Sequence, residues 1–154
     1  MLPYAPDLLS DAGPIASSLG DRFESRPEQL RMAAAVVKAM DQKSHLLVEA
    51  GTGVGKSFAY LVPAMLRAAT LGEVVVLSTH TIALQEQLIQ KDIPLLQGAL
   101  AEVLRSLPRE LKPVLVKGRG NYVSIRRLEQ ASKRQDRLFA DPAARRSLHV
   151  IEDW

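Results

Sequence analysis

The most constraining feature of the sequence is the glycine-rich stretch Ala-Gly-Thr-Gly-Val-Gly-Lys-Ser at residues 50–57, which we call the phosphate loop. It nearly matches the phosphate-binding pattern G-x-x-x-x-G-K-[ST], with Ala50 where the first glycine is expected. In such loops, backbone N–H groups surround the phosphates, and the dipole of the following helix adds positive potential. We therefore expect this stretch to connect a buried strand to the N-terminus of a helix.

The residues of the phosphate loop have distinct expected roles. Glycine at three positions permits positive φ angles and close approach of the backbone to a phosphate. Lys56, the candidate catalytic residue, is expected to reach the β- and γ-phosphates, and the Ser57 hydroxyl is expected to ligate Mg²⁺. Ala50 fits the first position if its φ is negative, because that position only turns the chain out of the strand. The expected phosphate-binding residues are Ala50, Gly51, Thr52, Gly53, Val54, Gly55, Lys56 and Ser57.

Hydrophobic patterning predicts an α/β fold with a parallel sheet flanked by helices. Three short apolar segments are expected to be strands, at residues 45–49, 73–78 and 113–116. Helical spacing predicts helices near 25–43, 57–71, 82–91 and 124–139, with further helical pieces reaching about residue 107 and following residue 142. The alternation of strands and helices is typical of right-handed crossover connections in a parallel sheet.

Several helix ends carry recognisable signals. Ser25 and Glu28 have the spacing of a capping box, and Pro27 suits the first helical turn, where a missing N–H costs nothing. Pro63 lies inside a predicted helix and is expected to kink it mildly. Pro94 is expected to end the helix that begins near residue 82.

Composition and charge bound the domain organisation. A chain of 154 residues favours one domain, and its net charge of +3 alone does not indicate a nucleic-acid partner. Residues 1–24, rich in proline and glycine, are expected to form an N-terminal arm with at most one short helical turn. Residues 25–154 form the remaining region, in which 118–154 is a basic helical segment. The basic residues from 117 to 146 are Lys117, Arg119, Arg126, Arg127, Lys133, Arg134, Arg137, Arg145 and Arg146.

The composition also excludes some chemistry. The chain has no cysteine, so its residues cannot form a disulfide, a thiolate zinc site or an iron–sulfur cluster. Its N-terminus lacks the basic and apolar regions of a signal peptide, and no run approaches the about 18 apolar residues of a membrane span. We therefore expect a cytoplasmic protein with no membrane partner.

Four elements of the sequence together carry a resemblance to a known family. The sequence R-P-E-Q at 26–29 is similar to the adenine-reading element of superfamily 2 helicases, and 50–57 is similar to their A-x-T-G-x-G-K-[ST] loop. Residues 75–88 resemble their motif Ia, and 116–123 resemble the K-G-R-x-N-Y segment of the DinG/XPD branch of DNA helicases. The elements occur in family order and span residues 23 to about 128. The resemblance implies a partial RecA-like P-loop NTPase lobe in an ATP-dependent DNA helicase.

The resemblance also implies ligands for named residues. Arg26 and Gln29 join the nucleotide-binding set, with the Gln29 amide bonding adenine, so that ATP and Mg²⁺ are the expected cofactors. Single-stranded DNA is the expected partner. The implied nucleic-acid contacts are Thr79, His80, Thr81, Gln85, Lys117, Arg119 and Tyr122.

The sequence departs from the branch in two ways. Ser124 stands where iron–sulfur members carry their first cluster cysteine, so the chain is similar to the clusterless members. It also contains no D-E-x-H motif to orient water, and no second lobe to close over the γ-phosphate. We therefore expect a fragment of a longer helicase that binds ATP and lacks the residues to hydrolyse it.

Other interpretations remain open. The loop could be a flexible turn, although this would not explain Lys56 and Ser57 directly after the third glycine. The chain could be a stand-alone nucleotide or nucleic-acid binding module without hydrolysis, or a small-molecule kinase whose basic tail acts as a lid. Thr79 could cap a helix, Tyr122 could belong to a core, and the basic run could be a solvated helix face. Gln29 and Gln85 could likewise be solvated helix residues, and His80 could be a loop histidine whose hydrogen bonds are satisfied within the protein.

Overall fold

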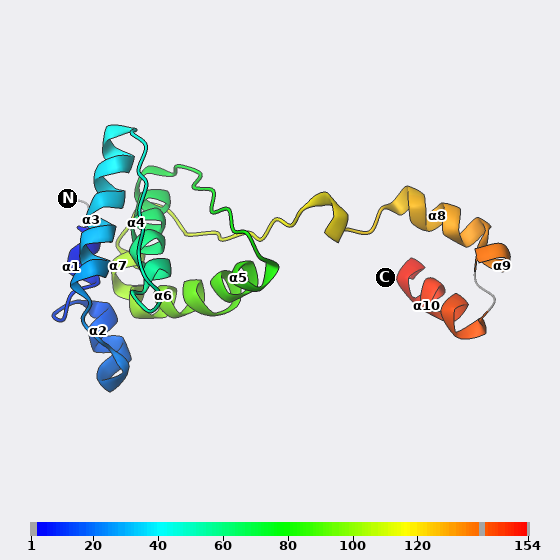
Figure 1. Cartoon of the computed structure of the whole chain (residues 1–154), viewed down its shortest axis with the longest axis horizontal. Coiled ribbons are helices and arrows are strands. Elements are labelled where there is room, and N and C mark those ends of the chain that lie inside the picture. The colour runs from blue at the N-terminus through cyan, green and yellow to red at the C-terminus, as the bar shows by residue number, and fades with distance from the viewer. Residues whose placement is uncertain (1–2, 139–140, 154) are drawn as a thin grey trace. The chain divides into compact units, whose positions relative to one another are not determined.

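The computed structural model describes residues 3–138 and 141–153. The chain divides into two compact units, Met1–Leu115 and Val116–Trp154, which are described separately below. The helices of the first unit (Figure 1) are α1 (Ala5–Leu8), α2 (Pro14–Leu19), α3 (Pro27–Gln42), α4 (Lys56–Leu71), α5 (Ile82–Gln87), α6 (Ile93–Ala99) and α7 (Ala101–Arg105), with a 3₁₀ turn at Gly20–Arg22 and a π-helical segment at Leu88–Asp92.

The N-terminal residues form part of the core of the first unit. Where the sequence predicts at most one short helical turn, the structure has both α1 and α2, with Leu9 and Ile15 almost fully buried. Gly13 joins the two helices, and a Cβ at this position would lie 2.6 Å from the backbone oxygens of Asp7 and Leu8. Only glycine permits this close approach, so residue 13 fixes the packing of α1 against the start of α2.

Helix α3 follows the predicted bounds closely, but its N-terminus differs from the prediction. Pro27 occupies the first turn as expected, whereas the N-cap is Arg26 and no side chain caps this end. The predicted capping box of Ser25 and Glu28 is therefore wrong; Glu28 instead accepts a hydrogen bond from Arg31 at 2.8 Å. The helix ends at Gln42, and its C-cap, Lys43, has a left-handed backbone with φ of 50°.

Helix α4 has eight buried residues and packs along α3 (Figure 1). Leu61 and Val62 are almost fully enclosed, and Pro63 lies inside the helix as predicted. Burying apolar surface of this kind stabilises a fold by about 25 cal/mol per Å². The core formed by α4 with α1, α3 and α6 thus holds the N-terminal end of α4 in a defined place.

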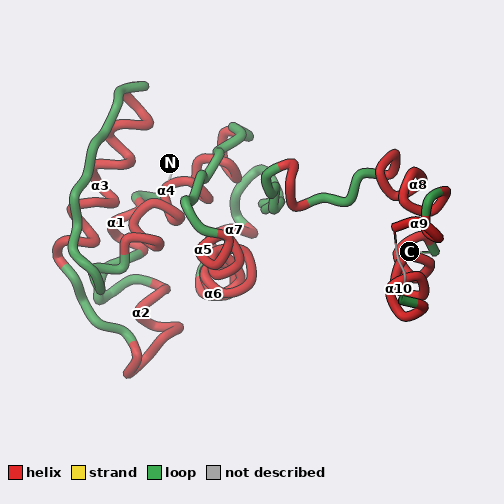
Figure 2. The backbone as a smooth tube through the Cα atoms, turned by 45° about the vertical axis from the view of Figure 1, so that its right-hand side comes forward, coloured by secondary structure: helices red, strands yellow, loops and turns green. Residues whose placement is uncertain are grey.

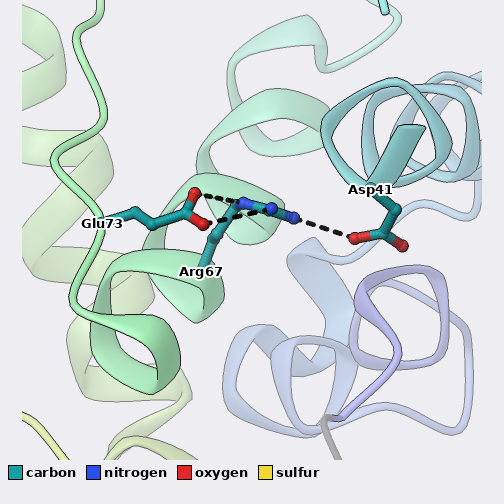
Figure 3. Close-up of polar contacts among 3 residues, drawn as sticks. All are labelled: Asp41, Arg67 and Glu73. Atoms are coloured by element: carbon teal, nitrogen blue, oxygen red, sulfur yellow. Dashed lines mark hydrogen bonds and ion pairs between the residues drawn. The ribbon is translucent and has the colours of Figure 1, made fainter. Parts of the chain in front are cut away.

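An arginine on α4 links this helix to both of its neighbours (Figure 3). The Arg67 guanidinium donates to Asp41 of α3 at 2.8 Å and to Glu73 at 2.5 and 3.3 Å. The hydrogen bond from Arg67 lowers the pKa of Glu73 below its ordinary value, and the two carboxylates raise the pKa of Arg67. The Arg67 side chain therefore joins the last turn of α3 to the segment that follows α4.

The region after α5 is continuous helix with a local distortion. Residues Leu88–Asp92 adopt a π-helical turn, and α6 begins directly afterwards with Pro94 in its first turn. The prediction that Pro94 ends the helix is therefore wrong. Proline lacks an N–H and is accepted where the regular hydrogen-bond ladder is already interrupted, as at this junction.

The predicted parallel sheet is contradicted by the structure. Within residues 3–138 and 141–153 there is no β-strand, and Figure 2 shows helices and loops. The segments expected to be strands, 45–49, 73–78 and 113–116, are largely exposed: Leu47 is 99% exposed, Val74 91% and Val114 78%. A strand requires a neighbouring strand for its backbone hydrogen bonds, and β-branched composition alone does not supply one. The α/β, RecA-like fold prediction is therefore wrong for this structure.

The described residues of the second unit form helices and turns. The unit contains a 3₁₀ turn at Arg119–Asn121, then α8 (Ile125–Lys133), α9 (Gln135–Leu138) and α10 (Pro142–Glu152). Asp141 caps α10 by accepting from the backbone N–H of Ala143 at 2.9 Å. Phe139, the predicted end of the basic helix, lies outside the described residues. Across the described part of the chain, no helix has the length and apolar character needed to span a membrane.

Candidate functional site

Residues 50–55 of the phosphate loop lie directly before α4, and Lys56 and Ser57 are the first residues of this helix. A helix therefore follows the loop as predicted, whereas the buried strand expected before it is absent from residues 45–49. Gly55 is the N-cap of α4, with φ of 76°, and Gly53 has φ of 82°. These two residues thus adopt the left-handed backbone that side chains disfavour. Gly51 does not have a positive φ, and a Cβ there would meet no protein atom within 4 Å, so the backbone conformation of the loop does not itself require glycine at this position. Ala50 also lacks a positive φ, which agrees with the argument that alanine fits the first position.

The side chain of Lys56 folds back over the loop. Its Nζ donates hydrogen bonds to the backbone oxygens of Ala50, at 2.9 Å, and Gly51, at 2.7 Å. The ammonium group is therefore held by the first two residues of the loop. Ser57 follows in the first turn of α4 and is half-buried.

Gln29 connects α3 to the phosphate loop. Gln29 is 5% exposed, and among the described residues it is the only polar or charged residue that is buried. Its Nε2 donates to the backbone oxygen of Gly55 at 2.9 Å. Arg26 lies on the same side, since its Nη1 is 3.5 Å from the position that a Gly55 Cβ would occupy, and it pairs with Glu24. The structure thus brings both predicted adenine-element residues to the loop.

The arrangement has the electrostatic character of an anion site. The first N–H groups of a helix have no intrahelical partner, and the helix dipole places partial positive charge at this end. Lys56 and Arg26 add two cationic side chains beside the same turn. The described residues contain no cluster of three carboxylate, histidine or cysteine side chains that could hold a metal alone. A metal at this loop would therefore need oxygen ligands from a bound molecule in addition to Ser57.

The predicted nucleic-acid residues of the first unit lie at the start of α5. Thr81 is the N-cap of α5, and its Oγ1 accepts from the backbone N–H of Leu84 at 3.3 Å. The Thr79 hydroxyl donates to the Thr81 backbone oxygen at 3.0 Å. His80 is exposed and Gln85 is half-buried. Thr81, rather than Thr79, thus has the capping role that sequence reasoning considered for this segment.

The remaining predicted nucleic-acid residues lie in the second unit. The Tyr122 hydroxyl accepts from the backbone N–H of Lys117 at 2.8 Å, which closes the turn around Arg119. Tyr122 is 55% exposed, so it is not a core residue. Arg119 is exposed as well. The turn therefore presents an aromatic ring and a guanidinium group to solvent.

One contact of the site was missed by sequence reasoning. The hydrogen bond between Gln29 and Gly55 joins residues that are 26 positions apart, and no periodicity in the sequence indicates it. Motif resemblance identified both residues as nucleotide-binding but not their contact with each other.

Comparison with known proteins defines the family. Residues 28–117, more than half of the chain, match the DEAD/DEAH box helicase family. The chain belongs to that family. It is 44% identical over 147 residues to ATP-dependent helicase DinG of Mycobacterium tuberculosis, an alignment that covers 90% of this chain and 21% of that protein. It is also 41% identical over 127 residues to ATP-dependent DNA helicase YoaA of Escherichia coli, covering 82% of this chain and 17% of that protein.

A third relative carries a different name. The chain is 32% identical over 120 residues to 3'-5' exonuclease DinG of Bacillus subtilis, covering 78% of this chain and 12% of that protein. The chain therefore spans about a fifth or less of the length of these curated relatives. No solved structure matches it.

Proposed function

We propose that this chain is the ATP-binding portion of an ATP-dependent DNA helicase and that it binds ATP·Mg²⁺ and single-stranded DNA. The observation that carries the proposal is the phosphate loop at the start of α4. Within the loop, Lys56 donates to the Ala50 oxygen, and Gln29 of α3 donates to the Gly55 oxygen. Family membership and the names of the DinG and YoaA relatives support the same function. Unwinding is proposed for the whole helicase, of which these residues supply the nucleotide site.

In this proposal, each part of the loop contacts a different part of the nucleotide. Backbone N–H groups of residues 51–57 donate to phosphate oxygens, and Lys56 exchanges its bonds with Ala50 and Gly51 for bonds to the β- and γ-phosphates. Ser57 is the proposed protein ligand of Mg²⁺, which supplies neutralisation of phosphate charge when bound.

Gln29 is the proposed reader of adenine. A glutamine amide has two N–H donors and one oxygen acceptor, and the bond to Gly55 uses one N–H. The second N–H and the oxygen match adenine N7 and N6 respectively. Arg26 is proposed to contact the nucleotide from the same side.

The start of α5 and the turn at 117–122 are the proposed contacts with single-stranded DNA. The helix N-terminus capped by Thr81 offers N–H groups to a DNA phosphate, and His80 and Gln85 lie beside it. Lys117 and Arg119 supply positive charge, and the exposed ring of Tyr122 suits stacking on a base.

Hydrolysis is assigned to the whole helicase rather than to these 154 residues. Phosphoryl transfer depends on a residue that positions the attacking water, and the sequence has no D-E-x-H motif for this role. The alternative function, a binding module without hydrolysis, predicts the same binding by this chain but no unwinding by the whole protein.

Titration with a fluorescent ATP analogue tests nucleotide binding. The native chain is expected to bind in the presence of Mg²⁺, and Lys56→Ala is expected to bind at least tenfold more weakly because its charge contacts the phosphates. Lys43→Ala is a matched control, since Lys43 lies at the far end of α3. Equal affinity of the native and Lys56→Ala chains would contradict the proposed site.

A further inference from the structure

The contact between Gln29 and Gly55 has a role in the loop that does not depend on adenine. The Gly55 oxygen accepts hydrogen bonds from the N–H groups of Phe58, at 3.1 Å, and Ala59, at 3.3 Å, which begin α4. Gln29 donates to the same oxygen at 2.9 Å. The residue that starts the helix is thereby fixed to α3 as well as to α4.

The side chain of Gln29 is in direct contact with the backbone of Gly55. A Cβ on Gly55 would lie 2.1 Å from Gln29 Nε2, so the amide lies directly against the Gly55 backbone. Gly55 has φ of 76°, and the next two residues are Lys56 and Ser57. An amide that holds this peptide therefore also sets the direction of the residues expected to contact phosphate and metal.

We propose that Gln29 is a positioning residue for the phosphate loop, and that it strengthens binding of the triphosphate group itself, with or without an attached base. The inference rests on the proposed function, because it assumes that the loop binds phosphates. A loop already held in its binding conformation loses less conformational freedom when the ligand binds, and affinity rises accordingly. A residue that only reads adenine has no effect on a ligand without a base.

Calorimetric titration of Mg²⁺·tripolyphosphate into the 154-residue chain separates the two roles. Gln29→Met keeps the side-chain length but removes the donor. We expect tripolyphosphate affinity to fall by about three- to tenfold, the value of one hydrogen bond. Gln42→Met, the same substitution at the exposed end of α3, serves as control and is expected to bind like the native chain. Unchanged tripolyphosphate affinity in Gln29→Met, with weaker ATP binding, would overturn the inference.

Two further measurements distinguish positioning from general loss of structure. Gln29→His retains an N–H at the same number of bonds from Cβ, so it is expected to restore tripolyphosphate affinity but not the preference for ATP over GTP. Amide hydrogen exchange in Gln29→Met is expected to accelerate in residues 51–57 and not at Leu61 and Val62 in the core of α4. Affinity in Gln29→His as low as in Gln29→Met, or acceleration throughout α4, would contradict positioning by this hydrogen bond.

The same titrations separate this inference from the proposed function. If the native chain binds neither ATP nor tripolyphosphate, the proposed nucleotide site fails, and this inference fails with it. If the native chain binds ATP but not tripolyphosphate, the loop is not held ready for phosphates, and the inference alone fails. If both ligands bind and Lys56→Ala weakens both, the result for Gln29→Met decides the inference.

Discussion

The phosphate loop and the apolar segment at 73–78 are both conspicuous in the sequence, yet they differ in how the structure holds them. The loop is fixed by two glycines with positive φ and by side chains from α3 and α4. In the second segment, Glu73 pairs with Arg67, but Val74 and Val76 are exposed. The loop conformation depends on a few residues and one neighbouring helix, and it is present in the structure. The strand predicted at 73–78 depends on a partner strand, and it is not formed.

The two regions also show that an apolar side chain stabilises the fold only where it is buried. Leu47 precedes the loop in an exposed segment, while Leu96 of α6 is fully buried in the core of the first unit. A buried leucine gains the transfer free energy of its side chain and many dispersion contacts, and an exposed leucine gains neither. Identical side chains in the two regions are therefore expected to contribute very differently to the free energy of unfolding.

The largest predicted effect is the difference between two leucine truncations. Leu96→Ala is expected to lower the free energy of unfolding by about 2–5 kcal/mol, because it leaves a cavity in the core. Leu47→Ala is expected to change it by less than about 0.5 kcal/mol. Urea unfolding of both variants measures the difference. Equal destabilisation would mean that Leu47 is buried in solution and would remove the contrast between the regions.

A second pair of substitutions tests the geometry of the loop. Gly55→Ala is expected to destabilise the chain by about 1–3 kcal/mol, because its φ is positive and its Cβ would meet the Gln29 amide. Gly51→Ala is expected to be close to neutral, since a Cβ at Gly51 would meet no atom within 4 Å. Thermal unfolding of the two variants provides the measurement. A larger effect at Gly51 would contradict the observed loop conformation.

The C-terminal end of α3 gives a smaller effect of opposite sign. Lys43 has φ of 50°, a left-handed conformation that glycine adopts more readily than lysine. Lys43→Gly is therefore expected to stabilise the chain by about 0.5–1 kcal/mol. Gln42→Gly, one residue earlier and within the helix, is expected to destabilise it by about 1 kcal/mol. Destabilisation by both substitutions in chemical unfolding would show that residue 43 is not left-handed in solution.

The smallest predicted effect concerns the ion pair between Glu73, in the segment at 73–78, and Arg67 of α4. Arg67 lowers the pKa of Glu73, so their pairing stabilises the fold when pH is above the ordinary glutamate pKa of about 4.3, and that stabilisation is lost as pH falls through the lowered value. Glu73→Gln is therefore expected to be slightly less stable than the native chain at neutral pH and equally stable in acid. Unfolding curves at several pH values test this, and a difference that grows in acid would contradict it.

The helices could be predicted from the sequence where local signals govern them. The predicted helix at 57–71 corresponds to α4 (Lys56–Leu71), because apolar periodicity and the preceding glycine act within a few residues. Helices α1 and α2 exceed the single short helical turn predicted for residues 1–24, because proline and glycine in a sequence usually indicate breaks. Pro6 and Pro14 instead occupy first turns, where proline is tolerated.

The candidate site divides in the same way. The left-handed backbone at Gly53 and Gly55 could be predicted from the loop pattern alone, because the pattern places glycine where φ is positive. The contact of Gln29 with Gly55 could not be assigned, because it depends on how α3 packs against α4. The three predicted strands failed for a related reason: their β-branched residues indicate what a segment favours, not whether a partner lies beside it.

The central claim is that the geometry of the phosphate loop, with Gly55 held by Gln29, binds the nucleotide. Calorimetric titration of Mg²⁺·ATP into the native chain, Gly98→Ala and Gly55→Ala tests it most directly, because Gly98 lies in α6 and a Cβ there would meet no neighbouring atom within 4 Å. We predict one saturable site with similar affinity in the native chain and Gly98→Ala, and at least tenfold weaker binding in Gly55→Ala. Similar affinity for all three chains would contradict it.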